Sequence, residues 1–93
     1  MGEYSMQRAI QAFLDQSRLK NDIQVLQIES VWEEIMGKTV ARYTEKIELV
    51  QGSLFVTTSV APLKQELSFQ KELIAGRINE RLGQFIVKTV VIR

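Results

Sequence analysis

Residues 46–57, which read KIELV-QG-SLFVT, decide the fold. Apolar and polar residues alternate on both sides of the central QG dipeptide, which is typical of two strands joined by a tight hairpin turn. With a two-residue turn, one face of the hairpin holds four apolar side chains: Ile47, Leu49, Leu54 and Val56. Turn and pattern therefore predict the same register, and this face is expected to lie against the core. The opposite face carries Lys46, Glu48, Thr57 and the aromatic Phe55.

Two stretches before the hairpin have apolar residues at helical spacing. Residues 4–18 predict a first helix, with its apolar positions at Met6, Ile10, Phe13 and Leu14. Residues 23–36 predict a second helix, with its stripe at Val25, Ile28, Trp32 and Ile35. The Lys20-Asn21-Asp22 cluster between them is interpreted as a polar break that caps the second helix, and Gly37 as the residue that ends it.

The segment after the hairpin predicts one long helix and a final strand. Ser59 is a suitable N-cap, Pro62 suits a first turn, and the apolar stripe runs to Leu82 before Gly83. Residues 86–92 are β-branched apart from Lys88 and predict a strand. The order is α-α-β-β-α-β, an α+β domain in which a three-stranded sheet has helices packed on one face. The long helix returns the chain, so the last strand is expected to run parallel to the second. The sequence leaves open whether the last strand pairs with the first or the second strand of the hairpin.

Composition limits the chemistry that this chain can perform. It has 93 residues, a formal net charge of +1, no Cys and no His. Thiolate and Ser-His-Asp catalysis are therefore excluded within the chain, and the commonest metal ligands are missing. Glu29 and Glu33 share a helix face that would suit Mg²⁺ or acid–base work, but a solvated face is the favoured interpretation. We expect a single soluble, cytoplasmic domain (residues 1–93) that binds a partner, is not an enzyme and uses no cofactor or metal. Residues 1–5 are expected to be disordered or foreign to the native domain.

A few basic and aromatic residues are candidates for binding. Trp32, on an apolar helical stripe, is best explained as a core anchor. Phe55 points away from the helices and suits either a stacking platform, a protein-binding anchor or a cross-strand contact. Charge alone favours a solubilising role for the basic residues, because carboxylates are interleaved with them. The residues that would contact phosphates weakly are Lys38, Arg42, Lys46, Lys64 and Lys71.

From Trp32 onward the sequence resembles the DciA-like family in five successive blocks. WEEIMG at 32–37 is similar to its W-x-x-(I/V)-hydrophobic-G signature, and VARYT at 40–44 to its next block. GSLFV at 52–56 resembles G-x-L-x-V. SVAPLKQEL at 59–67 and the Leu73–Gly83 segment, which contains INERLG, resemble the closing blocks. Within these blocks the resemblance implies structural roles for Trp32, Gly37, Leu67, Asn79 and Gly83.

The resemblance also implies a fold and a function. The expected fold is a KH-like domain, and the expected function is non-enzymatic: binding of the bacterial replicative DNA helicase in DNA replication, with weak, salt-dependent binding of DNA. The chain lacks the GXXG loop with which ordinary KH domains grip nucleotides. Two alternatives remain open at this point. One is a protein-interaction or homo-oligomerisation module without nucleic-acid binding, and the other is an RNA-binding KH-like domain.

Overall fold

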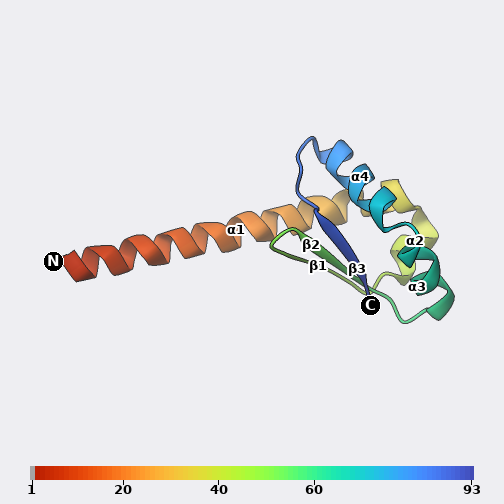
Figure 1. Ribbon diagram of the computed structural model, residues 1–93, viewed down its shortest axis with the longest axis horizontal. Helices are drawn as coiled ribbons and strands as arrows, with labels where there is room; N and C mark the ends of the chain where they lie inside the picture. Colours follow the sequence, from red (N-terminus) through yellow and green to blue (C-terminus); the bar gives the residue numbers. More distant parts are fainter. Residues whose placement is uncertain (1) are drawn as a thin grey trace.

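The computed structural model describes residues 2–93, with side chains described from Arg18 onward. Four helices and three strands follow one another along the chain (Figure 1). They are α1 (Gly2–Met36), α2 (Lys38–Tyr43), β1 (Lys46–Val50), β2 (Ser53–Thr57), α3 (Ala61–Ser68), α4 (Lys71–Leu82) and β3 (Thr89–Ile92).

The sheet contains the predicted hairpin, and β2 is its central strand. Strand β1 pairs antiparallel with β2 in the predicted register, with Leu49 opposite Leu54 and Val50 opposite Ser53. Strand β3 runs parallel to β2, as predicted, and the order is β1-β2-β3. This order answers the question that the sequence left open, because β3 lies beside β2 rather than β1. The expected α+β class with a three-stranded sheet is confirmed, and the arrangement is consistent with a small KH-like fold.

The core lies between one face of this sheet and the helices. Helix α1 packs against β1, whereas α3 and α4 pack against β3. The four apolar hairpin residues contribute to this core, together with Ile28 and Trp32 of α1. The remaining buried hydrophobic residues are Leu67, Ile74, Ile78, Ile86, Val87 and Val90. No helix in the part of the chain that the structure describes is long and apolar enough to span a membrane.

The predicted break between residues 18 and 23 is wrong, because α1 is continuous from Gly2 to Met36. Lys20, Asn21 and Asp22 include neither Gly nor Pro, and each costs a helix interior only about 0.7 kcal/mol or less relative to Ala. A polar cluster of this kind is tolerated when the helix on its C-terminal side is anchored by burial of Ile28 and Trp32. The apolar set Met6, Ile10, Phe13 and Leu14 lies outside the residues whose side chains are described.

The single long helix predicted after the hairpin is also wrong, since Phe69 and Gln70 separate α3 from α4. Here the backbone tightens: the Phe69 N–H donates to Glu66 O and the Gln70 N–H to Leu67 O. The corner lets both Leu67 and Ile74 be buried, at 1% and 0% exposure, and leaves Phe69 81% exposed. Burying an apolar side chain on each side of the corner thus stabilises the fold more than a continuous helix would.

Two further boundaries differ from the prediction. Ser59 does not cap α3; its N-cap is Val60, whose N–H donates to Thr58 Oγ1 at 3.2 Å. Strand β3 begins only at Thr89. Ile86 and Val87 precede it in a loop and are nevertheless buried, so their apolar β-branched character reflects packing rather than strand pairing.

Candidate interaction surfaces

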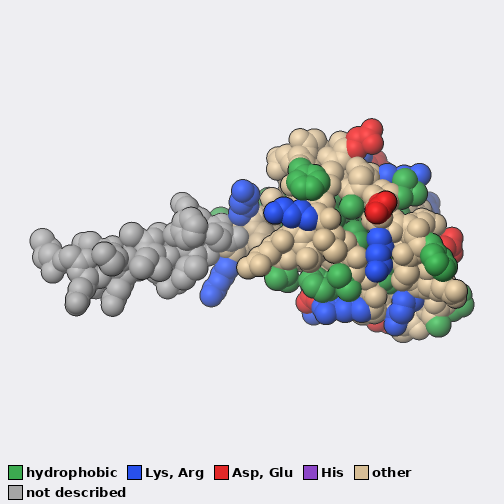
Figure 2. Space-filling model, viewed as in Figure 1, with side chains coloured by type: hydrophobic (Ala, Val, Ile, Leu, Met, Phe, Trp, Pro, Cys, Tyr) green, Lys and Arg blue, Asp and Glu red, His purple; other side chains and the backbone are tan. Residues whose placement is uncertain are grey.

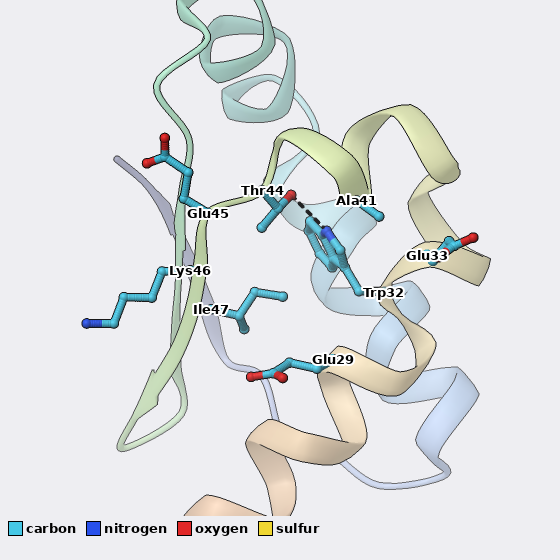
Figure 3. Close-up of a pocket in the computed structure, with 8 residues that line it drawn as sticks. All are labelled: Glu29, Trp32, Glu33, Ala41, Thr44, Glu45, Lys46 and Ile47. Atoms are coloured by element: carbon cyan, nitrogen blue, oxygen red, sulfur yellow. Dashed lines mark hydrogen bonds between the residues drawn. The ribbon is translucent and has the colours of Figure 1, made fainter.

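Trp32 joins the end of α1 to α2 (Figure 3). The indole is 3% exposed, and its Nε1–H donates to Thr44 Oγ1 at 3.0 Å. The Thr44 hydroxyl in turn donates to Val40 O at 2.7 Å. This relay ties the C-terminal end of the short helix α2 to the buried indole, so it helps to hold the exposed residues of α2 in place. A base-stacking role for Trp32 is not available in this buried position.

A groove of about 480 Å³ lies beside Trp32, between α1, α2 and the start of β1. Glu29 and Glu33 line it and are exposed. Figure 3 shows their carboxylates pointing to opposite sides, so the two groups do not converge on one point. Among residues 18–93 no group of three or more metal-ligating side chains is gathered into a site. Glu29 and Glu33 are therefore best described as solvated surface carboxylates.

The five candidate phosphate-contacting residues are exposed and lie on four different elements. On the face drawn in Figure 2, Lys and Arg side chains are scattered rather than gathered into one patch. Lys38 and Arg42 are one turn apart on α2, which Figure 1 shows with α3 at the end of the molecule opposite the N-terminus. Lys46 is engaged by Glu48, with 2.8 Å between Nζ and Oε1. The other four, Lys38, Arg42, Lys64 and Lys71, form no ion pair with any side chain in the described range 18–93.

The uncovered face of the sheet is organised by an arginine that the sequence analysis did not single out. The Arg93 guanidinium lies 4.5 Å from the centre of the Phe55 ring and also pairs with Glu48. Hydrogen bonds from Lys46 and Arg93 hold the pKa of Glu48 below its usual value. The Arg93 guanidinium therefore occupies one face of the Phe55 ring, and a base that stacks on this face must displace it. Arg93 could have been identified from the parallel pairing of β3 with β2. This pairing places Ile92 opposite Val56, so the next residue, Arg93, lies beside Thr57.

The family-motif residues lie at positions that shape the backbone. Asn79 Oδ1 accepts hydrogen bonds from the Ile86 and Val87 N–H groups at 2.9 and 2.8 Å, and its Nδ2 donates to Val87 O at 2.8 Å. Gly83 ends α4 in the left-handed conformation, with φ 69°. Gly37 separates α1 from α2 with φ 91° and ψ 164°, a combination that is essentially restricted to glycine.

These features define a class of protein. A mixed three-stranded sheet covered by helices on one face, with exposed basic and apolar side chains but no convergent reactive groups among the described residues, is a small KH-like α+β domain. The chain belongs to the DciA family: the family model described as "Dna[CI] antecedent, DciA" matches residues 5–92. This family has its role in bacterial DNA replication and helicase loading, and it is not a known enzyme family. Neither the curated proteins nor the solved structures yielded a match.

Proposed function

We propose that this chain binds the bacterial replicative DNA helicase directly and contacts DNA weakly, in the cytoplasm where replication takes place. The observation that carries the proposal is the family match over residues 5–92, which includes the whole sheet and all four helices except the first three residues of α1. In this proposal the helicase docks on the helical side or on the sheet edge. The DNA phosphates are contacted by Lys38, Arg42, Lys46, Lys64 and Lys71.

Helix α2 supports the phosphate contacts best. Lys38 and Arg42 are four residues apart, so both side chains leave the same face of the helix. Both are exposed, and the Trp32–Thr44 relay fixes the helix that carries them. Two cations one turn apart, without an ion pair to any side chain in the range 18–93, are suited to the phosphates of one strand. Lys46 must leave Glu48 to take part, so its contribution is expected to be smaller.

DNA binding is tested by its salt dependence. Five phosphate contacts on duplex DNA give a slope of about −4.5 in log K against log salt, so affinity falls roughly 500-fold between 50 and 200 mM salt. A dissociation constant of about 1 μM or weaker is expected for such non-specific binding. Binding that is unchanged over this salt range would refute the phosphate contacts.

Charge reversal tests the residues themselves. The double variant Lys38→Glu/Arg42→Glu is expected to weaken DNA binding and to reduce the salt slope by about 2. The matched control is Arg77→Glu/Lys88→Glu, which makes the same change in net charge at two other exposed positions. If both double variants lose affinity equally, only the overall charge matters and the α2 assignment is wrong.

Helicase binding is tested with purified components. The chain and a bacterial replicative helicase are mixed, treated with nuclease and separated by size-exclusion chromatography. Coelution after nuclease treatment supports direct binding. Coelution that disappears with nuclease shows a link through DNA, and no coelution under either condition refutes the helicase proposal.

A further inference from the structure

Helix α1 carries a second apolar stripe that its own domain does not cover. Leu19, Ile23 and Leu26 are 60%, 47% and 64% exposed. They are spaced i, i+4 and i+7, so they fall within an arc of about 60° on the helix. The same geometry places them about 170° from the midpoint of Ile28 and Trp32, which face the core. A helix that is apolar on two opposite sides is expected to pack on both.

A shallow groove borders this stripe on each side. One, of about 350 Å³, lies between α1 and Gln84 and is lined by Leu19 and Ile23. The other, of about 480 Å³, lies between Leu26 and strand β1, where Val50 is 56% exposed. A ridge with a groove on either side is the surface that another helix packs against, because its own side-chain rows enter the grooves.

We propose that this stripe, Leu19-Ile23-Leu26, is a self-association surface on which α1 of a second copy packs in antiparallel orientation. Charge complementarity indicates a second copy. Residues 18–22 of α1 carry two exposed cations, Arg18 and Lys20, and one exposed carboxylate, Asp22, whereas residues 29–34 carry exposed carboxylates and no cation. An antiparallel pair brings each basic segment to the acidic segment of the other copy, whereas a parallel pair aligns like charges. The net charge of +1 opposes association only weakly.

The register follows from the stripe. If the two-fold axis passes through Ile23, residue i lies opposite residue 46 − i of the other copy. Leu19 then lies one residue from Leu26, and Arg18 one residue from Glu29, so apolar and charged contacts form together. Figure 1 shows the N-terminal half of α1 extending beyond the sheet. Helix outside a domain is marginally stable in water, so packing two such helices together stabilises both.

The first test is the oligomeric state of the full chain. Sedimentation equilibrium is expected to show a monomer–dimer equilibrium. The variant Ile23→Glu/Leu26→Glu should raise the dissociation constant about tenfold or more, because it places like charges in the desolvated seam. Its control is Phe69→Glu/Leu73→Glu, which adds the same charge at two exposed apolar residues of the α3–α4 corner and should leave the equilibrium unchanged. Glu is a good helix former, so α1 is retained, and circular dichroism checks this.

Charge exchange separates an antiparallel pair from non-specific association. Arg18→Glu and Glu29→Arg should each weaken the dimer, and the double variant should restore it. The two residues are about 16 Å apart along one helix, so restoration requires contact between copies. A double variant that is no better than either single variant refutes the register.

Crosslinking tests the axis directly, since the chain has no cysteine of its own. A single Ile23→Cys variant should form an intermolecular disulfide under mild oxidation, whereas Glu33→Cys, about 15 Å along the helix, should not. Equal crosslinking at both positions indicates a parallel or random pair and overturns the proposal. A wild-type chain that stays monomeric at about 100 μM also overturns it. In that case, loss of helicase binding by Ile23→Glu/Leu26→Glu assigns the stripe to the helicase.

Discussion

Removing the Asn79 side chain should destabilise the domain more than any change at its surface. In Asn79→Ala the Val87 N–H loses its acceptor and Val87 O loses its donor, whereas the Ile86 N–H keeps only its contact with Gln84 O at 3.1 Å. Ile86 and Val87 are 7% and 1% exposed, so water cannot fully replace these bonds. Each buried group left unpaired costs about 1–3 kcal/mol. The better helix propensity of Ala returns about 0.6 kcal/mol.

The net loss is expected to be about 2–4 kcal/mol, a large part of the 5–15 kcal/mol that is typical of small domains. In urea denaturation followed by Trp32 fluorescence and circular dichroism, the midpoint should fall by about 2 M, given a slope near 1.5 kcal/mol/M. Asn79→Asp keeps the two accepting contacts but turns a carboxylate oxygen toward Val87 O, so it should lose an intermediate amount of free energy.

Asn21→Ala is the control, because it replaces an asparagine in α1 outside this loop and should raise stability by about 0.6 kcal/mol or less through helix propensity alone. A loss below about 1 kcal/mol for Asn79→Ala, with an unchanged slope, would refute the reasoning. It would show that the loop before β3 does not depend on the three hydrogen bonds.

Three further changes test other parts of the fold. Thr44→Val removes the acceptor of the buried Trp32 indole and should cost about 1–3 kcal/mol in the same denaturation experiment; no loss would show that the relay to α2 is unimportant. Gly83→Ala should cost about 1 kcal/mol through its positive φ, whereas Gly76→Ala, inside α4 with open space around it, should gain a similar amount; the same sign for both would contradict this account. The depressed pKa of Glu48 means that its ion pairs stabilise the fold fully above the ordinary carboxyl pKa and are lost as pH falls through the lower folded value. An NMR titration should place this pKa below 4.5, and Lys46→Ala should raise it.

The sequence predicts the parts of this fold that depend on neighbouring residues. The hairpin register is local, because the turn length and the alternation of apolar residues both specify it. The parallel course of β3 follows from the helical connection. The continuity of α1 and the corner at Phe69 are different, since each depends on what is buried at a distance. Asn21 and Asp22 suit both a cap and a helix interior, and the sequence alone does not distinguish these states.

The interaction surfaces likewise include features that depend on neighbouring residues and features that depend on distant parts of the chain. Exposure of Lys38 and Arg42 is expected of charged side chains, but the covering of Phe55 by Arg93 depends on which strand β3 adjoins. The sequence alone does not reveal the stripe on α1, for a related reason. With a break predicted at residues 20–22, Leu19 and Ile23 belonged to no common helix, and only the continuous helix places them on one face.

An antiparallel α1 pair would change how weak phosphate contacts act on DNA. The C-terminal end of α1, next to Lys38 and Arg42, lies 13 residues from Ile23, so the two α2 helices of a dimer would be about 40 Å apart along the helix axis. A duplex of 30 base pairs, about 100 Å long, spans both sites, whereas one of 8 base pairs, about 27 Å, does not. Bivalent binding should therefore raise the affinity of the wild-type chain for the long duplex well beyond the gain from length alone. Ile23→Glu/Leu26→Glu should lose this advantage and bind the short duplex as well as Phe69→Glu/Leu73→Glu does, in fluorescence anisotropy at one salt concentration. If the long-duplex advantage survives in the monomeric variant, the two DNA sites do not act together, and the proposed dimer has no part in DNA binding.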